Sequence, residues 1–284
     1  MSSLQALVHR SPPTWRVRSP SALAGAVLLA LISLMALSAG ALFPGDPLDM
    51  VGTPFLRPFT DAAHPLGTDM LGRDLAAGIF HGARASLVVA LVATAIAVAL
   101  GVLGGVIGGY HGGWIDAALM RVTEFFQTVP SFLFALAIVA VLQPTLTHIA
   151  LAIGITSWPG LARLVRAEVL KLRHGEMVQA AVALGASDAR IVFREILPNV
   201  LTPVLVSSSL MVATAILTES SLAFLGLGDP NVASWGNLVG AGREVLRTDG
   251  YVATVPGIAI VLTVLGLNLL GDGLGDLLDP RAQR

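Results

Sequence analysis

Few residues of this 284-residue sequence could do chemistry by their type and spacing, and the first candidates are His64, Asp69 and Asp74. Imidazole and carboxylate groups are common metal ligands, and these three occur within one short segment. No tight ligand spacing recurs among them, so we expect the two aspartates to cap short helices and His64 to be an ordinary loop residue. The sequence therefore predicts no metal site.

Nucleotide-binding and catalytic motifs are also missing from the sequence. The only lysine, Lys171, stands between Leu170 and Leu172, so it cannot belong to the GxxxxGK motif, followed by Ser or Thr, of a phosphate-binding loop. The six histidines are scattered, no HExxH motif or nucleophile elbow occurs, and the chain has no cysteine. We therefore expect neither enzyme activity nor a cofactor bound by the chain itself.

The composition indicates a membrane protein. Hydrophobic residues make up 55% of the chain, charged residues make up only 12%, and the mean hydropathy is +0.79. A chain this apolar cannot keep the surface of a soluble domain wet. The net charge of -1 creates no large field of one sign, so we expect no nucleic acid partner. The sequence predicts an all-α, polytopic protein in contact with membrane lipid.

Six apolar stretches are long enough to cross a bilayer, because a helix needs about 20 mostly apolar residues to span roughly 30 Å of hydrocarbon. The third stretch carries Arg121 and Glu124, which at three-residue spacing can pair on one helix face. The fourth contains Trp158, Pro159 and Gly160, where we expect a break in the helix. The predicted spans are residues 22–43, 85–108, 117–142, 148–166, 199–220 and 252–272.

The distribution of Lys and Arg predicts the orientation, because basic residues near the ends of spans stay in the cytoplasm. With both termini inside, 12 of the 17 basic residues are cytoplasmic, and the other five lie in or directly beside two outer loops, residues 44–83 and 221–251. The chain then divides into a cytoplasmic tail, residues 1–20, and a transmembrane domain, residues 21–284. A cleavable signal peptide is the alternative for the N-terminus, but the apolar run is longer than the roughly 7 to 15 residues typical of such peptides.

The few carboxylates near the spans disfavour an ion relay. Glu219 stands at the outer end of the fifth span, and Asp272, Asp276 and Asp279 stand at the inner end of the sixth. A charged group at the bilayer centre is costly and usually marks function. A carrier driven by protons or sodium would be expected to place carboxylates near the midplane, and none is securely placed there.

Glycines line one face of the second span. Gly101, Gly105 and Gly109, with Gly104 and Gly108, recur at helical spacing, so a neighbouring backbone can lie directly against this helix. Reading the GGVIGG segment as a phosphate loop is disfavoured, because no strand precedes it and no Lys-Ser or Lys-Thr follows. We therefore expect close helix packing at this face.

A polar segment, Lys171 to Pro198, separates two apolar stretches on the predicted inner side. Glu176 to Leu184 contains good helix formers, and Gly185 suits a helix C-terminus. Asp188 can cap a second short helix, which Pro198 would end or redirect.

The same segment also has the pattern of a DNA-reading helix-turn-helix. That alternative is disfavoured, because membrane spans tether both ends and only Arg190 and Arg194 could touch phosphate. We instead expect a docking element for another protein.

The end of this segment, QAAVALGASDARIVFREILP, resembles the cytoplasmic EAA loop of permease subunits of binding-protein-dependent ABC importers, through Ala180, Ala181, Gly185, Leu197 and Pro198. In that family the loop forms a coupling helix that sits in a cleft of the ATPase subunit. Gln179 stands where the family usually has Glu. The resemblance implies ATPase contacts for Glu176, Met177, Val178, Gln179, Ala180, Ala181, Leu184, Gly185, Ala186 and Ser187, with Leu197 and Pro198 ending the coupling loop, residues 171–198.

Four more segments are similar to the second, or C-type, permease of the peptide/nickel ABC importers. They are HPLGTDMLGRD, GARASL, FLGLGDPNVASWGNL and PGIAIVLTVLGLNLLGDGLGDLLDPR, in order over nearly the whole chain, with Gly275 where the family often has Arg. The resemblance implies the type I ABC importer permease fold. It also implies an outer gate formed by His64, Gly67, Asp69, Gly72, Arg73, Asp74, Phe224, Gly226, Gly228, Trp235 and Gly236.

The resemblance further implies a complex in the bacterial cytoplasmic (inner) membrane. Its parts would be this chain, a homologous second permease, two cytoplasmic ATPase subunits that use ATP and magnesium, and an extracytoplasmic substrate-binding protein. The expected function is peptide import by alternating access, driven by movement of the coupling loop. A nickel-chelate or other small-solute importer is the alternative, and an ion-coupled carrier or a non-transporting membrane anchor is disfavoured.

Overall fold

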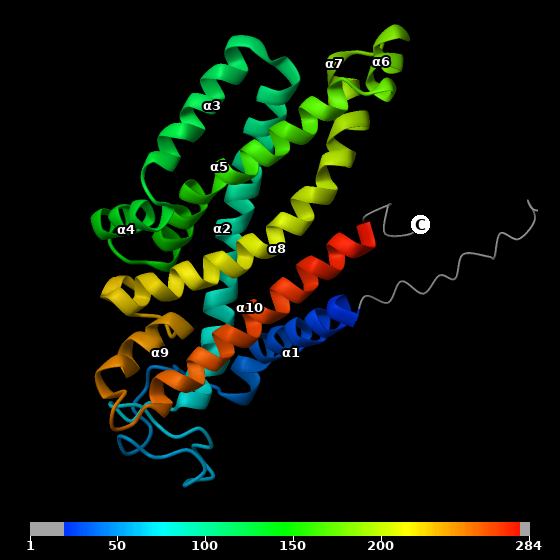
Figure 1. The fold of residues 1–284 in the computed structure, drawn as a ribbon. Helices are drawn as coiled ribbons and strands as arrows, with labels where there is room; N and C mark the ends of the chain where they lie inside the picture. The colour runs from blue at the N-terminus through cyan, green and yellow to red at the C-terminus, as the bar shows by residue number, and fades with distance from the viewer. Residues whose placement is uncertain (1–19, 279–284) are drawn as a thin grey trace, which may run out of the picture.

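The computed structural model describes residues 20–278, so nearly all of the predicted N-terminal tail, and Asp279 near the other end, lie outside the described residues. Within the described part the long elements are all helices, which confirms the predicted all-α fold (Figure 1). In chain order they are α1 (Pro20–Leu42), α2 (Leu75–His111), α3 (Gly113–Thr128), α4 (Ser131–Leu142), α5 (Leu146–Arg173), α6 (Glu176–Ala183), α7 (Asp188–Arg190), η1 (Ile191–Ile196), α8 (Leu197–Leu222), η2 (Ala223–Leu227), α9 (Trp235–Gly242), η3 (Arg243–Val245) and α10 (Tyr251–Leu278).

Five helices of the described part are long and apolar enough to cross a membrane: α1, α2, α5, the continuous helix Asp188–Leu227 and α10. Helices α3 and α4 pass the same test only as a pair, and they are bent by 79° at their junction. The predicted third span, residues 117–142, is therefore not one straight helix. Val129 is extended before Pro130, because a residue that precedes proline disfavours the α conformation.

Several helices are longer than the predicted spans, among them α2 and α5. α2 begins at Leu75, inside the predicted outer loop, because the Asp74 carboxylate accepts a hydrogen bond from the Ala76 N–H and caps the helix. α5 extends to Arg173 and continues through Pro159, so the predicted break there is wrong. A proline is tolerated inside a membrane helix when neighbouring helices hold its surroundings, and Trp158 and Pro159 are both buried.

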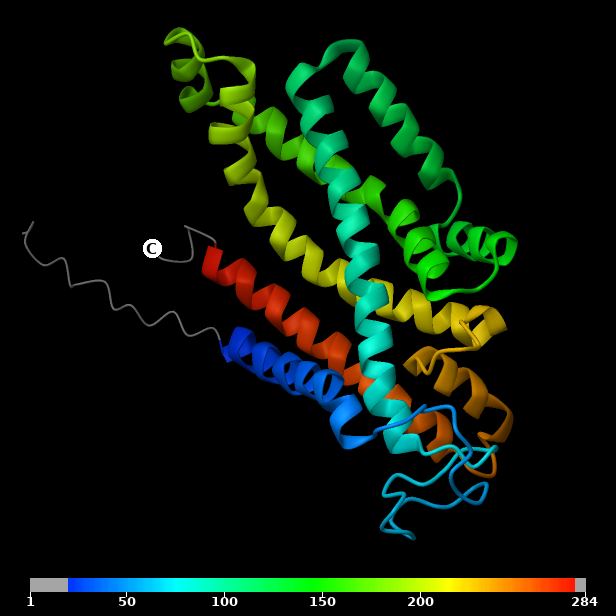
Figure 2. The same ribbon diagram turned by 180° about the vertical axis from the view of Figure 1, so that it is seen from behind.

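The glycine face of α2 packs on α5 as predicted. A Cβ added at Gly105 would lie 2.6 Å from the Ala162 carbonyl oxygen and from the Val165 side chain, and one at Gly109 would lie 2.8 Å from Val169. Only glycine permits backbones to approach this closely. Figure 2 shows the long α2 crossing α8 and α10, with one end of α1 beside its lower end and the predicted first outer loop below.

Helices α1, α10 and α8 run side by side in both views (Figure 1, Figure 2). Glycine again sets the approach, since a Cβ at Gly25 of α1 would lie 2.5 Å from the backbone nitrogen of Leu270 in α10. The connection between α5 and α8 projects at one end of the molecule, and the outer loops gather at the other.

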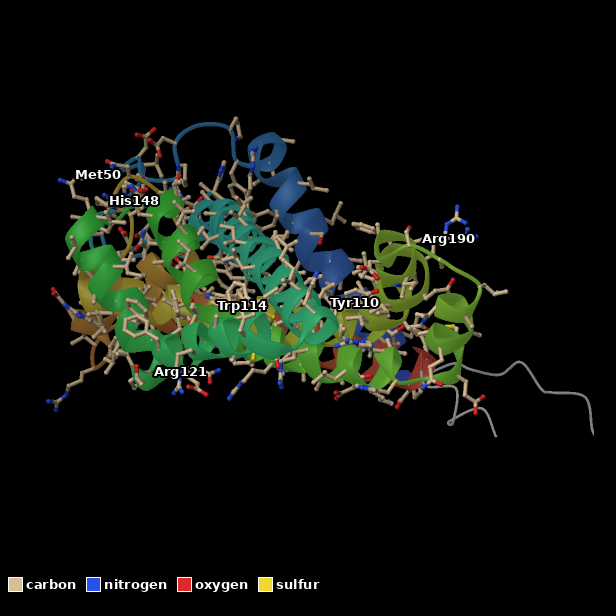
Figure 3. All side chains as sticks on the ribbon, turned by 90° about the horizontal axis from the view of Figure 1, so that it is seen from above. Met50, Tyr110, Trp114, Arg121, His148 and Arg190 are labelled. Atoms are coloured by element: carbon tan, nitrogen blue, oxygen red, sulfur yellow. The ribbon has the colours of Figure 1, made fainter. Side chains whose placement is uncertain are left out.

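Two ion pairs involve α3. Arg121 donates to Glu124 at 3.1 Å, which confirms the predicted pair, and both side chains are exposed. Figure 3 shows Arg121 at the edge of the molecule. Arg166 of α5 donates to both carboxylate oxygens of Asp116, with Nη2 2.6 Å from Oδ2. An exposed pair contributes little stability, whereas the two-pronged pair fixes α3 against α5.

Candidate functional site

Residues 174–187 join α5 to the following helix and form a projection that we call the elbow (Figure 1). Its helix α6 ends as predicted, because Gly185 adopts φ +76° and the Ala186 N–H donates to the Ala181 carbonyl at 3.1 Å. A Cβ added at Gly185 would meet no atom within 4 Å. The glycine is therefore needed for its left-handed backbone alone.

The helix after the elbow differs from the prediction. It is not short, since α7, η1 and α8 form one continuous helix, and Ser187 occupies its N-cap position in place of Asp188. Pro198 does not end it. The π-helical turn η1 changes the hydrogen-bonding register just before Pro198, and a proline in the first turn of α8 needs no N–H donor.

The inner side of the elbow is anchored in an apolar cluster. Val178 of α6 is 3% exposed and packs with Val169 of α5 and Ile191 of η1. Ala181 and Ala186 are partly buried against the same cluster. Because these side chains come from three consecutive elements, a displacement of α6 must displace the end of α5 and the start of α8 as well.

The outer side of the elbow is apolar and exposed. Met177, Val182 and Leu184 all face away from the cluster, and Leu184 is 88% exposed. Among the other residues predicted to contact an ATPase, the structure exposes Glu176, Gln179, Ala180, Gly185 and Ser187. Leu197 is partly buried and Pro198 exposed at the start of α8.

The Gln179 side chain contacts its own chain. Its Nε2 donates to the His174 carbonyl oxygen at 3.2 Å, across the turn that ends α5. A glutamate at this position has no N–H to donate when it is ionised. The amide thus gives this turn a contact that the acidic residue usual in the resembled family could not make.

Tyr110, at the end of α2 nearest the elbow, contacts the residues on either side of the elbow. Its hydroxyl donates to the Asp188 carboxylate at 2.7 Å, and the Arg173 guanidinium lies 5.8 Å from its ring centroid. Figure 3 places Tyr110 beside this part of the chain, with Arg190 pointing away from the protein. Sequence reasoning missed Tyr110, since no local motif marks a contact between residues 78 positions apart.

At the opposite end, residues 43–74 and 223–250 form what we call the outer cap. Asp69 accepts hydrogen bonds from the Leu71 and Arg73 N–H groups at 2.8 and 2.9 Å, so it closes a turn, and the prediction that it caps a helix is wrong. Asp74 does cap a helix, although this helix, α2, is long and not short as predicted. His64 Nδ1 lies 3.4 Å from an Asp74 oxygen. The described residues include no cluster of three potential metal ligands, and the structure therefore assigns these carboxylates to backbone geometry.

Two glycines shape the first half of the outer cap. Gly67 and Gly72 adopt φ +79° and +77°, and a Cβ at either would lie 2.2 Å from a backbone carbonyl oxygen. The Tyr251 hydroxyl, from the start of α10, donates to the carbonyls of Leu56 and Thr68 at 2.9 and 3.0 Å. These contacts bind the loop to the helical bundle.

A buried polar network holds the second half of the outer cap. Trp235 is fully buried, and its Nε1 donates to the Ile79 carbonyl at 2.9 Å. Glu219 is 1% exposed, beneath α9, and accepts a hydrogen bond from Ser234 Oγ at 2.7 Å. The Trp235 N–H donates to Ser86 Oγ at 3.2 Å, so α9 is bonded to α2 while Ser234 holds α8.

The two halves of the outer cap meet at a hollow lined by Asp69 and Arg73 from the first half and by Gly226 and Gly228 from the second. Gly226 adopts φ +86°, and a Cβ at Gly236 would lie 2.7 Å from Ser220. Phe224 is half-exposed beside the hollow, with the Arg243 guanidinium 5.7 Å from its ring. The structure thus brings the predicted outer residues together at one end of the bundle.

Curated relatives match nearly the whole chain. A probable peptide ABC transporter permease protein of Sinorhizobium fredii is 42% identical over 94% of this chain and 91% of its own length. The di/tripeptide transport system permease protein DppC of Pseudomonas aeruginosa is 37% identical, with 97% and 94% covered. The glutathione transport system permease protein GsiD of Pectobacterium atrosepticum is 36% identical, with 94% and 90% covered.

The fold is similar to that of a chain of the MetNI methionine ABC transporter in an inward-facing conformation. The TM-score is 0.54 over 71% of this chain and 94% of that chain, at 18% identity, so this likeness shows the fold alone. The family model described as the binding-protein-dependent transport system inner membrane component matches residues 101–284, which include the elbow and the second half of the outer cap. The chain therefore belongs to this family of inner membrane components, as an ABC transporter permease that has no ATPase activity of its own.

Proposed function

We propose that this chain is the permease subunit of an ATP-driven importer of peptides delivered by an extracytoplasmic substrate-binding protein. The observation that carries the proposal is the 42% identity over 94% of the chain to a probable peptide permease. Further relatives named for dipeptide, di/tripeptide and glutathione transport support the same substrate class, since glutathione is itself a modified tripeptide.

We infer the partners from the chain's exposed surfaces and from its lack of a nucleotide-binding motif. A family defined by dependence on a binding protein implies an ATPase and a binding protein. Of two cytoplasmic ATPase subunits, which supply ATP and magnesium, we assign one to the elbow, because the side chains of Met177, Val182 and Leu184 leave its outer side apolar and uncovered. A homologous second permease would complete the path across the membrane.

The proposed orientation places the elbow and both termini in the cytoplasm. It is supported by the 12 of 17 basic residues that this orientation leaves inside. The described ends of α1 and α10 also lie toward the same side of the bundle as the elbow (Figure 1). The outer cap would then face the binding protein.

The proposed mechanism is alternating access driven through the elbow. Closure of the ATPases would displace α6, and the cluster around Val178 would carry that displacement into α5 and α8. The Tyr110 to Asp188 hydrogen bond would carry it into α2. These helices would then open the bundle toward the outer cap.

Uptake by the purified complex in vesicles tests the function. With its ATPases, second permease and loaded binding protein, the complex should accumulate labelled trialanine when ATP is supplied, and vanadate should stop uptake while a protonophore should not. The Leu184→Asp variant should uncouple uptake, because it places a charge on the apolar side of the elbow. Arg121→Ala, an exposed change in α3, is the matched control.

Two results would contradict this proposal. Uphill uptake by the chain alone would show that no ATPase partner is needed. Uptake that a protonophore abolishes and vanadate leaves intact would indicate an ion-coupled carrier.

A further inference from the structure

A cavity of about 330 Å³ opens where α3 and α4 meet at their bend and face α2, α5 and α8, and its lining includes the exposed residues Gln127, Ser131 and Thr214. None of its lining residues is ionisable. Its apolar wall includes Phe126 and Met211. Its polar lining consists of neutral groups, the hydroxyls of Thr94, Ser131, Thr156, Ser157 and Thr214 and the amide of Gln127.

Thr94 is the unusual member of this lining. The residue is 7% exposed, and its hydroxyl is buried without a hydrogen-bond partner. Other threonines in the helices bond to their own backbone, as Thr156 does to the Ala152 carbonyl at 2.8 Å and Thr214 to the Leu210 carbonyl at 2.9 Å. A buried hydroxyl that is left unpaired opposes folding, so a group that persists in this state calls for a partner from outside the chain.

Thr94 lies at a depth in the bundle that a transported substrate would have to pass. It lies near the middle of α2, a helix of 37 residues that runs from the outer cap toward the elbow. The bend beside it creates the space, because Pro130 ends the run of α3 and α4 begins without a side-chain cap. The cavity thus joins exposed residues at the α3–α4 bend to the buried Thr94 of α2, and all its hydrogen-bonding groups are neutral.

We infer that this cavity binds the backbone of the transported peptide, with the Thr94 hydroxyl as hydrogen-bond partner of a peptide amide. The inference rests on the proposed peptide-import function. An amide is neutral, carries a donor and an acceptor, and is present in every peptide whatever its side chains. The charged ends of a peptide have no counter-charge among the lining residues, so the cavity takes an internal amide.

The test compares trialanine with its analogue in which the second amide is replaced by an ester, which has no N–H. Both are supplied at concentrations that saturate the binding protein, and the ratio of their uptake rates is measured on one preparation of the full complex. The wild-type complex should transport the amide about 3- to 10-fold faster, the range expected for one neutral hydrogen bond. Thr94→Val keeps the side-chain shape without the hydroxyl and should bring the ratio to about 1.

Two control variants separate this role from a structural one. Thr94→Ser retains the hydroxyl and should retain the ratio. Thr263→Val removes a buried hydroxyl outside the cavity that bonds to the Ala259 carbonyl at 2.7 Å, and it should also retain the ratio. Because the ratio compares two substrates on the same preparation, a variant that assembles in lower yield still gives a valid measurement.

Two outcomes would overturn the inference. An unchanged ratio in Thr94→Val would show that the hydroxyl holds only water. A diazirine-bearing tripeptide that crosslinks to the complex but never to Phe126, Met211 or other cavity residues would show that peptides pass elsewhere. Failure of the wild-type complex to import any peptide would instead overturn the proposed function, and this inference with it.

Discussion

Replacing Gly105 with alanine should loosen the contact between α2 and α5, whereas the same replacement at the adjacent Gly104 should not. A Cβ at residue 105 would lie 2.6 Å from the Ala162 carbonyl oxygen and from Val165, so backbone and side chain of α5 both obstruct it. A Cβ at residue 104 would lie 3.4 Å from the ring of Trp158, an ordinary contact. The two glycines therefore form a matched pair on one helix.

The expected magnitude follows from these distances. To restore an ordinary 3.4 Å separation at residue 105, α5 must move by 0.8 Å, the difference between 3.4 and 2.6 Å. Overpacking of this kind costs about 1–3 kcal/mol. The higher helix propensity of alanine offsets about 0.5–1 kcal/mol of that cost. We expect a net loss of about 1 kcal/mol at Gly105, within a range of about 0–2.5 kcal/mol, and no loss, or a gain of up to about 1 kcal/mol, at Gly104.

Unfolding of the purified protein in mixtures of mild detergent and SDS measures the difference. Tryptophan fluorescence is a suitable signal, because Trp158 lies at this helix contact. Equal stabilities for the two alanine variants would refute the argument from backbone approach, and so would a larger loss at Gly104. A loss at both sites would indicate that the face tolerates no methyl group at all.

Three further predictions address the elbow and the outer cap. Tyr110→Phe removes the hydrogen bond to Asp188 and should speed hydrogen exchange of the amides of residues 176–190 by about 3- to 10-fold, while exchange in α10 stays unchanged. Gln179→Glu replaces the donor to the His174 carbonyl with a carboxylate and should speed exchange in the same turn, whereas unchanged protection there would show that the contact is dispensable. Trp235→Phe keeps a buried aromatic ring but loses the hydrogen bond to the Ile79 carbonyl, so it should lower the free energy of unfolding by about 1 kcal/mol. Trp235→Ala removes the ring as well and should lower it by about 3–5 kcal/mol. Similar losses for the two variants would argue against a packing role for the ring.

Features that depend on local or periodic patterns could be predicted from the sequence. The glycine face around Gly105 follows from helical spacing, and the end of α6 at Gly185 follows from one residue's freedom to adopt positive φ. Asp74 was expected to cap a helix, and it does. Hydropathy predicted six spans, of which five correspond to long apolar helices of the described part and the third to the bent α3–α4 pair. It could not place the start of α2, because that helix continues beyond the apolar residues into the outer cap.

Features that depend on tertiary context could not be predicted. Pro130 interrupts a helix and Pro159 does not, although both stand in apolar stretches, because burial among neighbouring helices decides whether a proline is tolerated. Asp188 was expected to cap its helix but accepts the Tyr110 hydroxyl instead. Glu219 was recognised as a carboxylate near a span end, yet its partner Ser234 arrives from the folded outer cap, which no local spacing indicates.

Hydrogen bonds join the two ends of α2 to the two ends of the molecule. At the end beside the outer cap, Asp74 caps the helix and the Ile79 carbonyl accepts a hydrogen bond from the Trp235 indole N–H. At the end beside the elbow, the Tyr110 hydroxyl donates a hydrogen bond to Asp188. Between these ends the glycine face of α2 packs closely on α5, and α5 ends at Arg173, directly before the elbow. Close backbone packing resists bending, so α2 and α5 should respond to a force on the elbow as one unit. The cavity at Thr94 lies where this unit meets the bent α3–α4 pair and α8, and its shape therefore depends on where the elbow is held.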